Sequence, residues 1–359
     1  MIDSKGGTNM KKILIQESNN QLIDRRAKSM ILPEVHEFDE LRAFVLESAD
    51  FSGLTDFVLF LEVMKWVNTC WDHDGINGAE NTSSLEILKR AFEGENFRCV
   101  EYAKVTNDIL LSMGYIARSL TIFSENADYA GFGQAHSVTE VWSNRFEKWI
   151  FLDPQVNVYA TKNNIPLSYY EIYTSFDEVS FTFLSGESQG NENDYREFIS
   201  HYFGYLRIKS ILNDMKTDIF LQLSGKRQLM TFQAMQLSNA LFTDKVEEIY
   251  FNPNNTAILF DYKNSVDPNK IIKENNLETA EEMKDSFDLF FVKPNFALRF
   301  HTYTPHFDHY ELVMNEKEFK ITNHTYDWSL KEGSNKISVC SVNKQGIKGS
   351  LTEMKINYG

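Results

Sequence analysis

Apolar residues in the first third of the chain recur at helical spacing. Residues 54–71 form an apolar-rich stretch without proline, which predicts a buried helix. Ser83 begins a second helix, because Glu86 follows at the spacing of a capping box and Gly94 stands at the C-terminal stop. A third helix is predicted over 96–113 with Asn96 as its N-cap, and this places Cys99 in the first helical turn.

The period changes to that of strands after Gly114. Strands are predicted at 115–123, 135–142 and 149–153, so helices and strands together predict an α+β domain. The pattern from 155 to 240 is mixed, with one helix predicted at 194–215. From about 285 onward short strands alternate with turns, which predicts an all-β sandwich, with strands at 298–302, 310–314, 326–330, 336–342 and 351–356. We therefore expect an N-terminal tail over 1–40, an α+β domain over 41–240 and a β-sandwich over 241–359.

Composition narrows the classes of function. The chain has 359 residues, of which 42% are hydrophobic and 24% charged, the profile of a soluble globular protein with room for two domains. A formal net charge of −15 without a Lys- or Arg-rich run argues against nucleic acid as a partner. No apolar run is long enough for a membrane span, and the run after Met10 is too short for a signal peptide. We expect a cytoplasmic protein.

The cysteines are Cys70, Cys99 and Cys340, without a CxxC pair or a Cys/His spacing that predicts zinc. We expect reduced thiols and neither a metal nor a cofactor. Cys70 lies in an apolar helix and Cys340 in a strand, so both are interpreted as core residues. A weak metal site is conceivable near the start of the sandwich, although a loop around Pro305 explains its residues as well: His301, His306, Asp308 and His309.

His136 and Asp153 meet if their two strands form a hairpin. With a two-residue turn at 144–145, His136 lies directly opposite Asp153, and their Cβ atoms are about 5 Å apart. In that register Glu140 faces Trp149. The carboxylate can then accept a hydrogen bond from the imidazole.

Cys99 supplies the third group of this constellation. In the first turn of a helix its thiol lies among unpaired backbone N–H groups at the positive end of the helix dipole, which favours the thiolate. A nearby imidazolium lowers the thiol pKa further. Cys99 is therefore the predicted nucleophile, His136 the base and Asp153 the group that orients the imidazole.

Four short segments between about 60 and 175 stand in an informative order. They are Phe97-Arg-Cys99-Val-Glu-Tyr, Met113-Gly-Tyr-Ile-Ala-Arg118, His136-Ser-Val-Thr-Glu140-Val-Trp142 and Lys148-Trp-Ile-Phe-Leu-Asp153-Pro154. In this order and at these separations they resemble the transglutaminase-like core of the papain-like cysteine enzymes. The resemblance implies a nucleophile helix packed on an antiparallel sheet, and it places the same three roles on Cys99, His136 and Asp153.

The resemblance also bears on the pocket. Family members often use an aromatic side chain upstream of the cysteine to stabilise the oxyanion, which implies Trp66 or Trp71 here. Many members have Trp two residues after the histidine, where this chain has Val138, so its substrate preference is expected to differ. The C-terminal sandwich resembles the fibronectin type III or immunoglobulin-like modules that follow such cores in some bacterial proteins.

The resulting hypothesis is an enzyme that attacks an amide carbonyl through Cys99, forms a thioester and resolves it with water or an amine. Its substrate would be a protein, a peptide or another amide. One alternative is a catalytically silent module whose sandwich binds a protein or a glycan. A peptide:N-glycanase-like deglycosylase shares the triad, but the missing CxxC pairs argue against it.

Overall fold

The computed structural model describes residues 11–24, 35–127, 130–131, 133–184, 191–212, 215–223 and 239–359. The chain divides into two compact units. The first, here called the α+β unit, is Asp24–Asn254, and the second, the sandwich unit, joins Met1–Ile23 to Asn255–Gly359. The boundary expected at 240 therefore falls at 254.

Helices gather in the first half of the α+β unit, as predicted. Ser83 accepts a hydrogen bond from the backbone N–H of Glu86 at 3.2 Å, which is the predicted cap. Among the described residues no helix is long and apolar enough to cross a bilayer. The described α-helices of this unit are α2 (Val35–Ser48), α3 (Asp56–Thr69), α4 (Ser84–Phe92), α5 (Cys99–Ser112), α6 (Tyr169–Thr174) and α7 (Glu192–Ser200).

A nine-stranded sheet forms the centre of the unit, in the order β10-β9-β8-β2-β3-β4-β5-β6 with β7 beside β5. Neighbouring strands are antiparallel except for the parallel pair β9 and β10. The strands are β2 (Ala117–Phe123), β3 (Ala135–Ser143), β4 (Lys148–Asp153), β5 (Val158–Lys162), β6 (Ile165–Pro166), β7 (Ser180–Phe183), β8 (Tyr205–Leu212), β9 (Met215–Gln222) and β10 (Ala240–Thr243).

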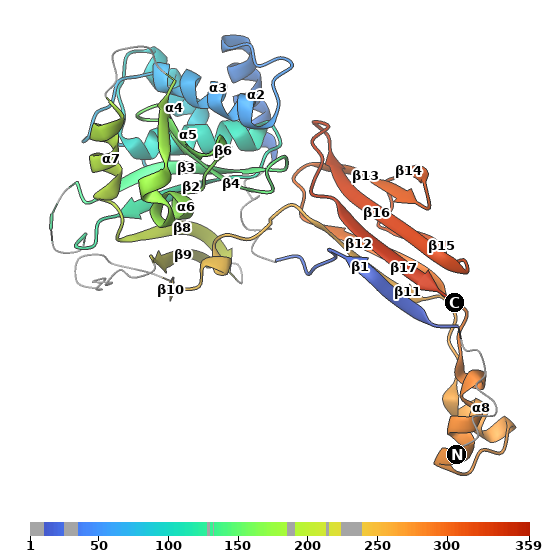
Figure 1. Ribbon diagram of the computed structural model, residues 1–359. Coiled ribbons are helices and arrows are strands. Elements are labelled where there is room, and N and C mark those ends of the chain that lie inside the picture. Colours follow the sequence, from blue (N-terminus) through green and yellow to red (C-terminus); the bar gives the residue numbers. More distant parts are fainter. Residues whose placement is uncertain are drawn as a thin grey trace. The chain divides into compact units, whose positions relative to one another are not determined.

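The two faces of this sheet pack against different helices. On one face α5 packs against β2 and β3 (Figure 1). There the hydroxyl group of Thr139 donates a hydrogen bond to the Ala103 carbonyl of α5 at 3.0 Å. Val138 and Trp142, on the other face of β3, belong to a core that also holds residues of α6 and α7. Side chains alternate along a strand, so even-numbered positions of β3 face α6 and α7. His136 is one of them.

The predicted hairpin between β3 and β4 forms, but its register is displaced by two residues. Glu140 lies opposite Phe151 instead of Trp149, because four residues, 144–147, connect the strands where two were predicted. Glu147 adopts a positive φ of 51° in this loop. A shift by two residues leaves every side chain on its predicted face, whereas a shift by one would have reversed them.

The helix predicted over 194–215 ends early, since α7 stops at Ser200 and strand β8 begins at Tyr205. Gly204 makes the turn between them and donates its N–H to the carbonyl of Phe123 at 2.9 Å. A Cβ at this position would collide with the backbone of Ser124. Close approach to β2 therefore decides where the helix must end.

The sandwich unit contains two sheets, of which one has the order β1-β17-β16-β13-β14 and the other β11-β12-β15. The prediction of a tail over 1–40 is wrong for Ile13–Ser18, because this segment forms β1 and pairs with β17. The strands of this unit are β1 (Ile13–Ser18), β11 (Thr256–Tyr262), β12 (Asn295–Thr302), β13 (Phe307–Met314), β14 (Lys317–Ile321), β15 (Thr325–Ser329), β16 (Gly333–Asn343) and β17 (Thr352–Tyr358).

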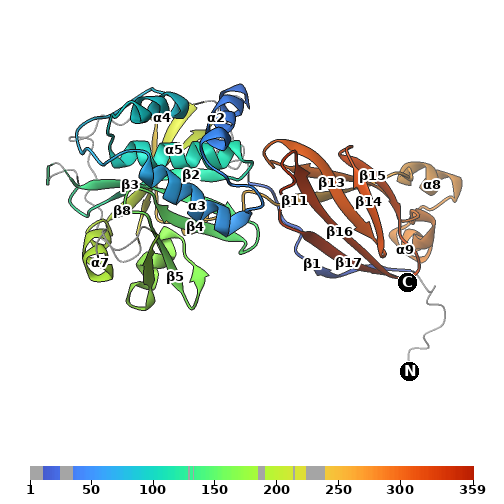
Figure 2. The same ribbon diagram turned by 90° about the horizontal axis from the view of Figure 1, so that it is seen from above.

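Both sheets contribute to one apolar core, which includes Leu298 and Trp328 from the smaller sheet and Leu312 and Val339 from the larger. The two sheets therefore pack on a shared core, which is the arrangement that a β-sandwich requires. Between β11 and β12 the chain makes α8 (Pro268–Glu274), α9 (Ala280–Asp285) and a 3-10 turn at Phe287–Phe290. Figure 2 shows α8 and α9 together at one end of the sandwich.

Candidate active site

Cys99 is the first residue of α5 and is partly exposed. Its N-cap is Arg98, not Asn96 as predicted, because the Asn96 side chain accepts the backbone N–H of Asp72 at 3.1 Å and holds the preceding loop. Arg98 pairs with Glu101 in the same first turn at 3.2 Å. The predicted placement of Cys99 at the N-terminus of a helix is correct, and there the helix dipole favours a negative charge on sulfur.

His136 and Asp153 lie at the same end of the sheet, the histidine near the start of β3 and the aspartate at the end of β4. The Nε2 atom of His136 is 2.9 Å from the Oδ2 atom of Asp153, and their side chains are 3% and 0% exposed. The displaced register makes them diagonal neighbours instead of directly opposed ones, a separation that a histidine and an aspartate can bridge. The Val156 N–H also donates to Asp153, at 3.3 Å.

This geometry assigns the two ring nitrogens of His136. Because Nε2 is engaged by the Asp153 carboxylate, Nδ1 is the nitrogen left for the Cys99 thiol. Burial raises the pKa of that thiol, but a hydrogen bond with His136, the positive charge of its imidazolium and the N–H of Ser137 together outweigh burial. The net result is a thiol pKa below its ordinary value, even though the charge of Asp153 opposes it.

Burial by itself lowers the pKa of His136, since it disfavours the charged ring. The charge and hydrogen bond of Asp153 and the interaction with Cys99 act the other way, and they raise the pKa of His136 to about 10. A lowered thiol pKa and a raised imidazole pKa both favour a thiolate–imidazolium pair over two neutral groups.

Helix α7 supplies residues that the sequence did not predict. Tyr195 donates its hydroxyl to Oδ2 of Asp153 at 2.9 Å and is buried. The ring centroids of Phe198 on α7 and of Tyr202, two residues after the helix ends, lie 5.2 Å and 5.7 Å from the ring centroid of His136. The helical pattern at 194 was the available signal, but nothing in the chain indicates that this helix packs against β3 and β4.

The two tryptophans proposed for the oxyanion lie in different surroundings. Trp66 is in edge contact with the rings of Phe51 and Phe92, which form a packing cluster. Trp71 lies against Tyr102 of α5, with ring centroids 4.4 Å apart, and its buried Nε1 has no hydrogen-bond partner among the described residues. Of the two, Trp71 is the one with a described ring contact to α5, the helix that carries Cys99.

A buried ion pair joins β3, the strand that carries His136, to its neighbour β2. Arg118 of β2 donates to Glu140 of β3 at 2.6 Å and 3.0 Å, and its guanidinium lies 3.9 Å from the ring centroid of Trp149. Glu140 also accepts the N–H of Tyr169 at 2.8 Å and the hydroxyl of Tyr250 at 3.0 Å. Arg118 also donates to the Ile249 carbonyl at 2.6 Å, so both buried charges have further hydrogen bonds beyond the pair itself.

The loop before α4 brings His73 near the site, although the sequence assigned it no function. His73 forms a backbone bridge with Phe97, and Asp74 donates its N–H to the Phe97 carbonyl at 3.0 Å. Burial and the charge of His136 lower the pKa of His73. No group of three or more potential metal ligands occurs among the residues that the structure describes.

No protein-family model and no curated protein matches the chain. Among solved structures, a candidate cysteine protease from Cytophaga hutchinsonii is 14% identical with a TM-score of 0.30, over 40% of this chain and 49% of that one. This chain thus spans about half of that protein. A red sea bream transglutaminase is 10% identical with a TM-score of 0.26, over 96% of this chain and 76% of that one. At these values neither structure assigns the chain a family or an activity.

Proposed function

We propose that the chain is a transglutaminase-like enzyme that transfers acyl groups from amides through Cys99. The observation that carries the proposal is the buried hydrogen bond between His136 and Asp153, at 2.9 Å, beside a helix-terminal cysteine whose thiol pKa the histidine lowers. A structural cysteine needs neither feature, and buried apolar surroundings alone would raise its pKa.

The contacts support a sequence of bond changes. The Cys99 thiolate attacks the amide carbon, and the carbonyl electron pair moves to oxygen. The backbone N–H of Cys99 and Nε1 of Trp71 would stabilise that oxyanion. The His136 imidazolium then gives its Nδ1 proton to the leaving amine, the C–N bond breaks and a thioester remains. Water or a second amine, deprotonated by neutral His136, attacks the thioester and releases the thiolate.

Asp153 keeps the imidazole oriented throughout this sequence. Its carboxylate fixes the proton on Nε2 and stabilises the imidazolium that pairs with the thiolate. Tyr195 and the Val156 N–H occupy the remaining acceptor positions of the carboxylate, so Asp153 is held by partners on α7 and in the chain after β4.

The sequence motifs and the second unit agree with this proposal. The four segments that resemble the transglutaminase-like core place Cys99, His136 and Asp153 in the family's order. In the sandwich, strands β11, β12 and β15 face β13, β14, β16 and β17, which is the order of an immunoglobulin-like module. Such a module would serve to bind a protein or glycan partner.

A screen of peptide and protein amides tests the proposal. Wild type and Cys99→Ala are compared for the release of amine or ammonia and for the incorporation of a fluorescent primary amine into casein. Cys70→Ala is the matched control, because it also removes one partly buried thiol. We expect turnover that Cys99→Ala abolishes and Cys70→Ala retains. Turnover that survives in Cys99→Ala would contradict the proposed nucleophile, and a lack of any turnover would favour the silent binding module.

A further inference from the structure

The sandwich unit has an open seam along one side, defined by Ile13, Ile15, Phe260 and Tyr262. Ile13 and Ile15 lie opposite Tyr358 and Ile356 on the core face of β17. They are nevertheless 40% and 56% exposed. The larger sheet extends to β1 at this side, whereas the smaller sheet ends at β11, so no described strand covers the inner face of β1.

The same seam is visible along β11. Phe260 and Tyr262 lie opposite Leu298 and Phe296, two core residues of β12, so they too are on the core face. The first three residues of β11 are buried but the last four are exposed, with Phe260 at 36% and Tyr262 at 49%. Apolar side chains on the core face that stay exposed mark a place where a further chain segment can pack.

The backbone of β11 explains where the seam begins. β11 is an edge strand, and Ile258 directs its N–H and carbonyl away from β12. The Asn20 side chain meets both groups, at 2.9 Å and 2.8 Å, as a neighbouring strand would. Thr352 likewise donates to the Thr256 carbonyl at 2.6 Å. Side chains therefore close the first half of this edge.

The second half of the edge has no such closure among the described residues. Hydrogen-bonding direction alternates along an antiparallel strand, so Phe260 and Tyr262 direct their N–H and carbonyl groups outward, as Ile258 does. Lys263 lies one position further along and faces the other way: its backbone N–H donates to the carbonyl of Asn295, the first residue of β12, at 2.9 Å. The Asn20 side-chain amide pairs with the outer edge of β11 as far as Ile258. An extended peptide could pair with the same edge beyond that residue.

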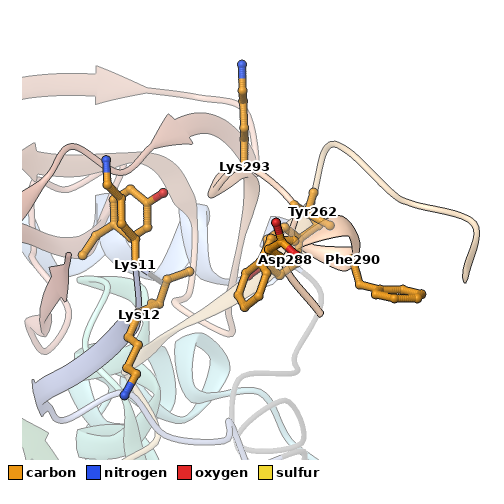
Figure 3. Close-up of a pocket in the computed structure, with 10 residues that line it drawn as sticks. Lys11, Lys12, Tyr262, Asp288, Phe290 and Lys293 are labelled. Carbon is orange, nitrogen blue, oxygen red and sulfur yellow. The ribbon is translucent and has the colours of Figure 1, made fainter. Parts of the chain in front are cut away.

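A cavity of about 1030 Å³ lies at the Tyr262 end of the seam. Its wall combines Ile13 and Tyr262 with a segment after the 3-10 turn that contributes Phe291, and lysines stand around it: Lys11, Lys12 and Lys293. Figure 3 shows the ammonium groups of Lys11 and Lys293 directed to one side of the view and that of Lys12 to the opposite side. The spread of charge suits an extended acidic chain better than a compact anion.

The charge at this place differs from that of the whole chain. The formal net charge is −15, yet among the described residues three lysines and one acidic residue, Asp288, line the cavity. Lys11 is paired with Glu332, whereas Lys12 and Lys293 have no ion pair with any described residue. Two free ammonium groups beside an apolar cavity attract a negatively charged ligand with apolar side chains.

We propose that the open seam and its cavity bind an acidic, extended peptide segment of another protein by strand addition to β11. The peptide backbone pairs with Phe260 and Tyr262, its apolar side chains cover Ile13 and Ile15, and its carboxylates meet Lys12 and Lys293. Main-chain pairing gives affinity in this mode, and the side-chain pocket gives selectivity. The site is independent of the proposed catalytic triad.

Fluorescence anisotropy with the full chain tests the inference. The probe is a fluorescein-labelled octapeptide of alternating valine and glutamate, and its matched partner has lysine in place of glutamate. We expect the glutamate probe to bind at low salt, to weaken as salt rises, and to bind at least about tenfold more tightly than the lysine probe. Equal affinities, or no binding of the glutamate probe up to about 1 mM, would overturn the proposal.

Two pairs of variants localise the binding. Tyr262→Pro removes the outward N–H without removing a hydrogen bond to β12, and Tyr262→Thr removes the same ring but keeps that N–H. We expect the proline variant to bind at least about tenfold more weakly than the threonine variant. The charge reversal Lys12→Glu with Lys293→Glu should have a similar effect relative to Lys317→Glu, which lies on β14.

Light scattering measures the oligomeric state and so tests the other occupant that the seam could have. A second copy of the chain could occupy the seam instead of a foreign peptide. A wild-type dimer that Tyr262→Pro converts to a monomer would show this and refute the proposal. Equal probe binding by both members of either variant pair would refute it as well. A monomeric wild type with the expected order of affinities supports it.

Discussion

The three cysteines should differ strongly in their reactivity toward an alkylating reagent. Burial raises the pKa of Cys70 to about 12 and that of Cys340 to about 11. Cys99 is also partly buried, but its interaction with His136 brings its pKa below the ordinary 9.0. One chain therefore contains two unreactive thiols that serve as internal controls for the third.

The expected selectivity follows from these values. At pH 7 a thiol with a pKa of about 12 is about 0.001% ionised and one with a pKa of about 11 about 0.01%, whereas a thiol below 9.0 is more than about 1% ionised. Thiolates of lower pKa are intrinsically weaker nucleophiles, which offsets these ratios by roughly 6-fold to 30-fold. Cys99 should still react at least about 30-fold faster than Cys70 and about tenfold faster than Cys340.

The assay is timed iodoacetamide labelling between pH 5 and 10, with each cysteine followed by peptide mass spectrometry. The thiolate forms as the pH passes the lowered pKa of Cys99, so its labelling rate should reach half of its plateau value below pH 9. In His136→Ala the hydrogen bond and the positive charge are lost, while burial and the charge of Asp153 both raise the thiol pKa. The rate for that variant should keep rising about tenfold per pH unit through pH 9.

Two results would refute this reasoning. One is wild-type labelling of Cys99 that rises through pH 9 with the same slope as Cys340, since the histidine would then have no influence on the thiol. The other is a pH profile in His136→Ala that coincides with wild type. The pH profile of turnover should also fall at high pH. Turnover needs the imidazolium, and His136 loses its proton as the pH passes its pKa of about 10.

Three further variants probe single contacts. Tyr195→Phe removes one of the hydrogen bonds to the buried Asp153 carboxylate. It should lower the free energy of unfolding by about 1.5–3 kcal/mol, and kcat by about tenfold at unchanged KM. Wild-type kinetics would contradict a role of Tyr195 in holding the carboxylate. Trp71→Phe should leave urea denaturation nearly unchanged, because its Nε1 has no partner to lose among the described residues, yet should lower kcat at least about 100-fold if that N–H donates to the oxyanion. Gly204→Ala should destabilise the protein by about 1–3 kcal/mol or more, since a Cβ there meets the backbone of Ser124, and a wild-type urea midpoint would disprove the close approach.

The core of the candidate site could be predicted from the sequence because its signals are local or have period two. The predicted helix over 96–113 agrees to within three residues with the helix that carries Cys99, although its predicted N-cap, Asn96, was wrong. The alternation of strand side chains put His136 and Asp153 on one face, and this survived a register error because the error was an even number of residues.

Other parts of the site depend on packing between distant segments. Tyr195 lies 42 positions after Asp153, and its helix has the same amphipathic pattern whichever face of the sheet it covers. The choice between Trp66 and Trp71 is of the same kind, because both belong to one apolar stretch and only the direction of the ring relative to α5 separates them.

The sequence by itself indicated the succession of helices and strands between residues 54 and 153, the shared face of His136 and Asp153, and the three residues of the proposed triad. Local backbone preferences and side-chain periodicity are written in neighbouring residues, so they can be recognised without coordinates. Only the tertiary structure decided that β1 joins the C-terminal sandwich, that α7 closes over the histidine and the aspartate, and that one side of the sandwich stays open. These pairings join residues far apart in the chain, and their free energy comes from shape and burial that no single segment contains.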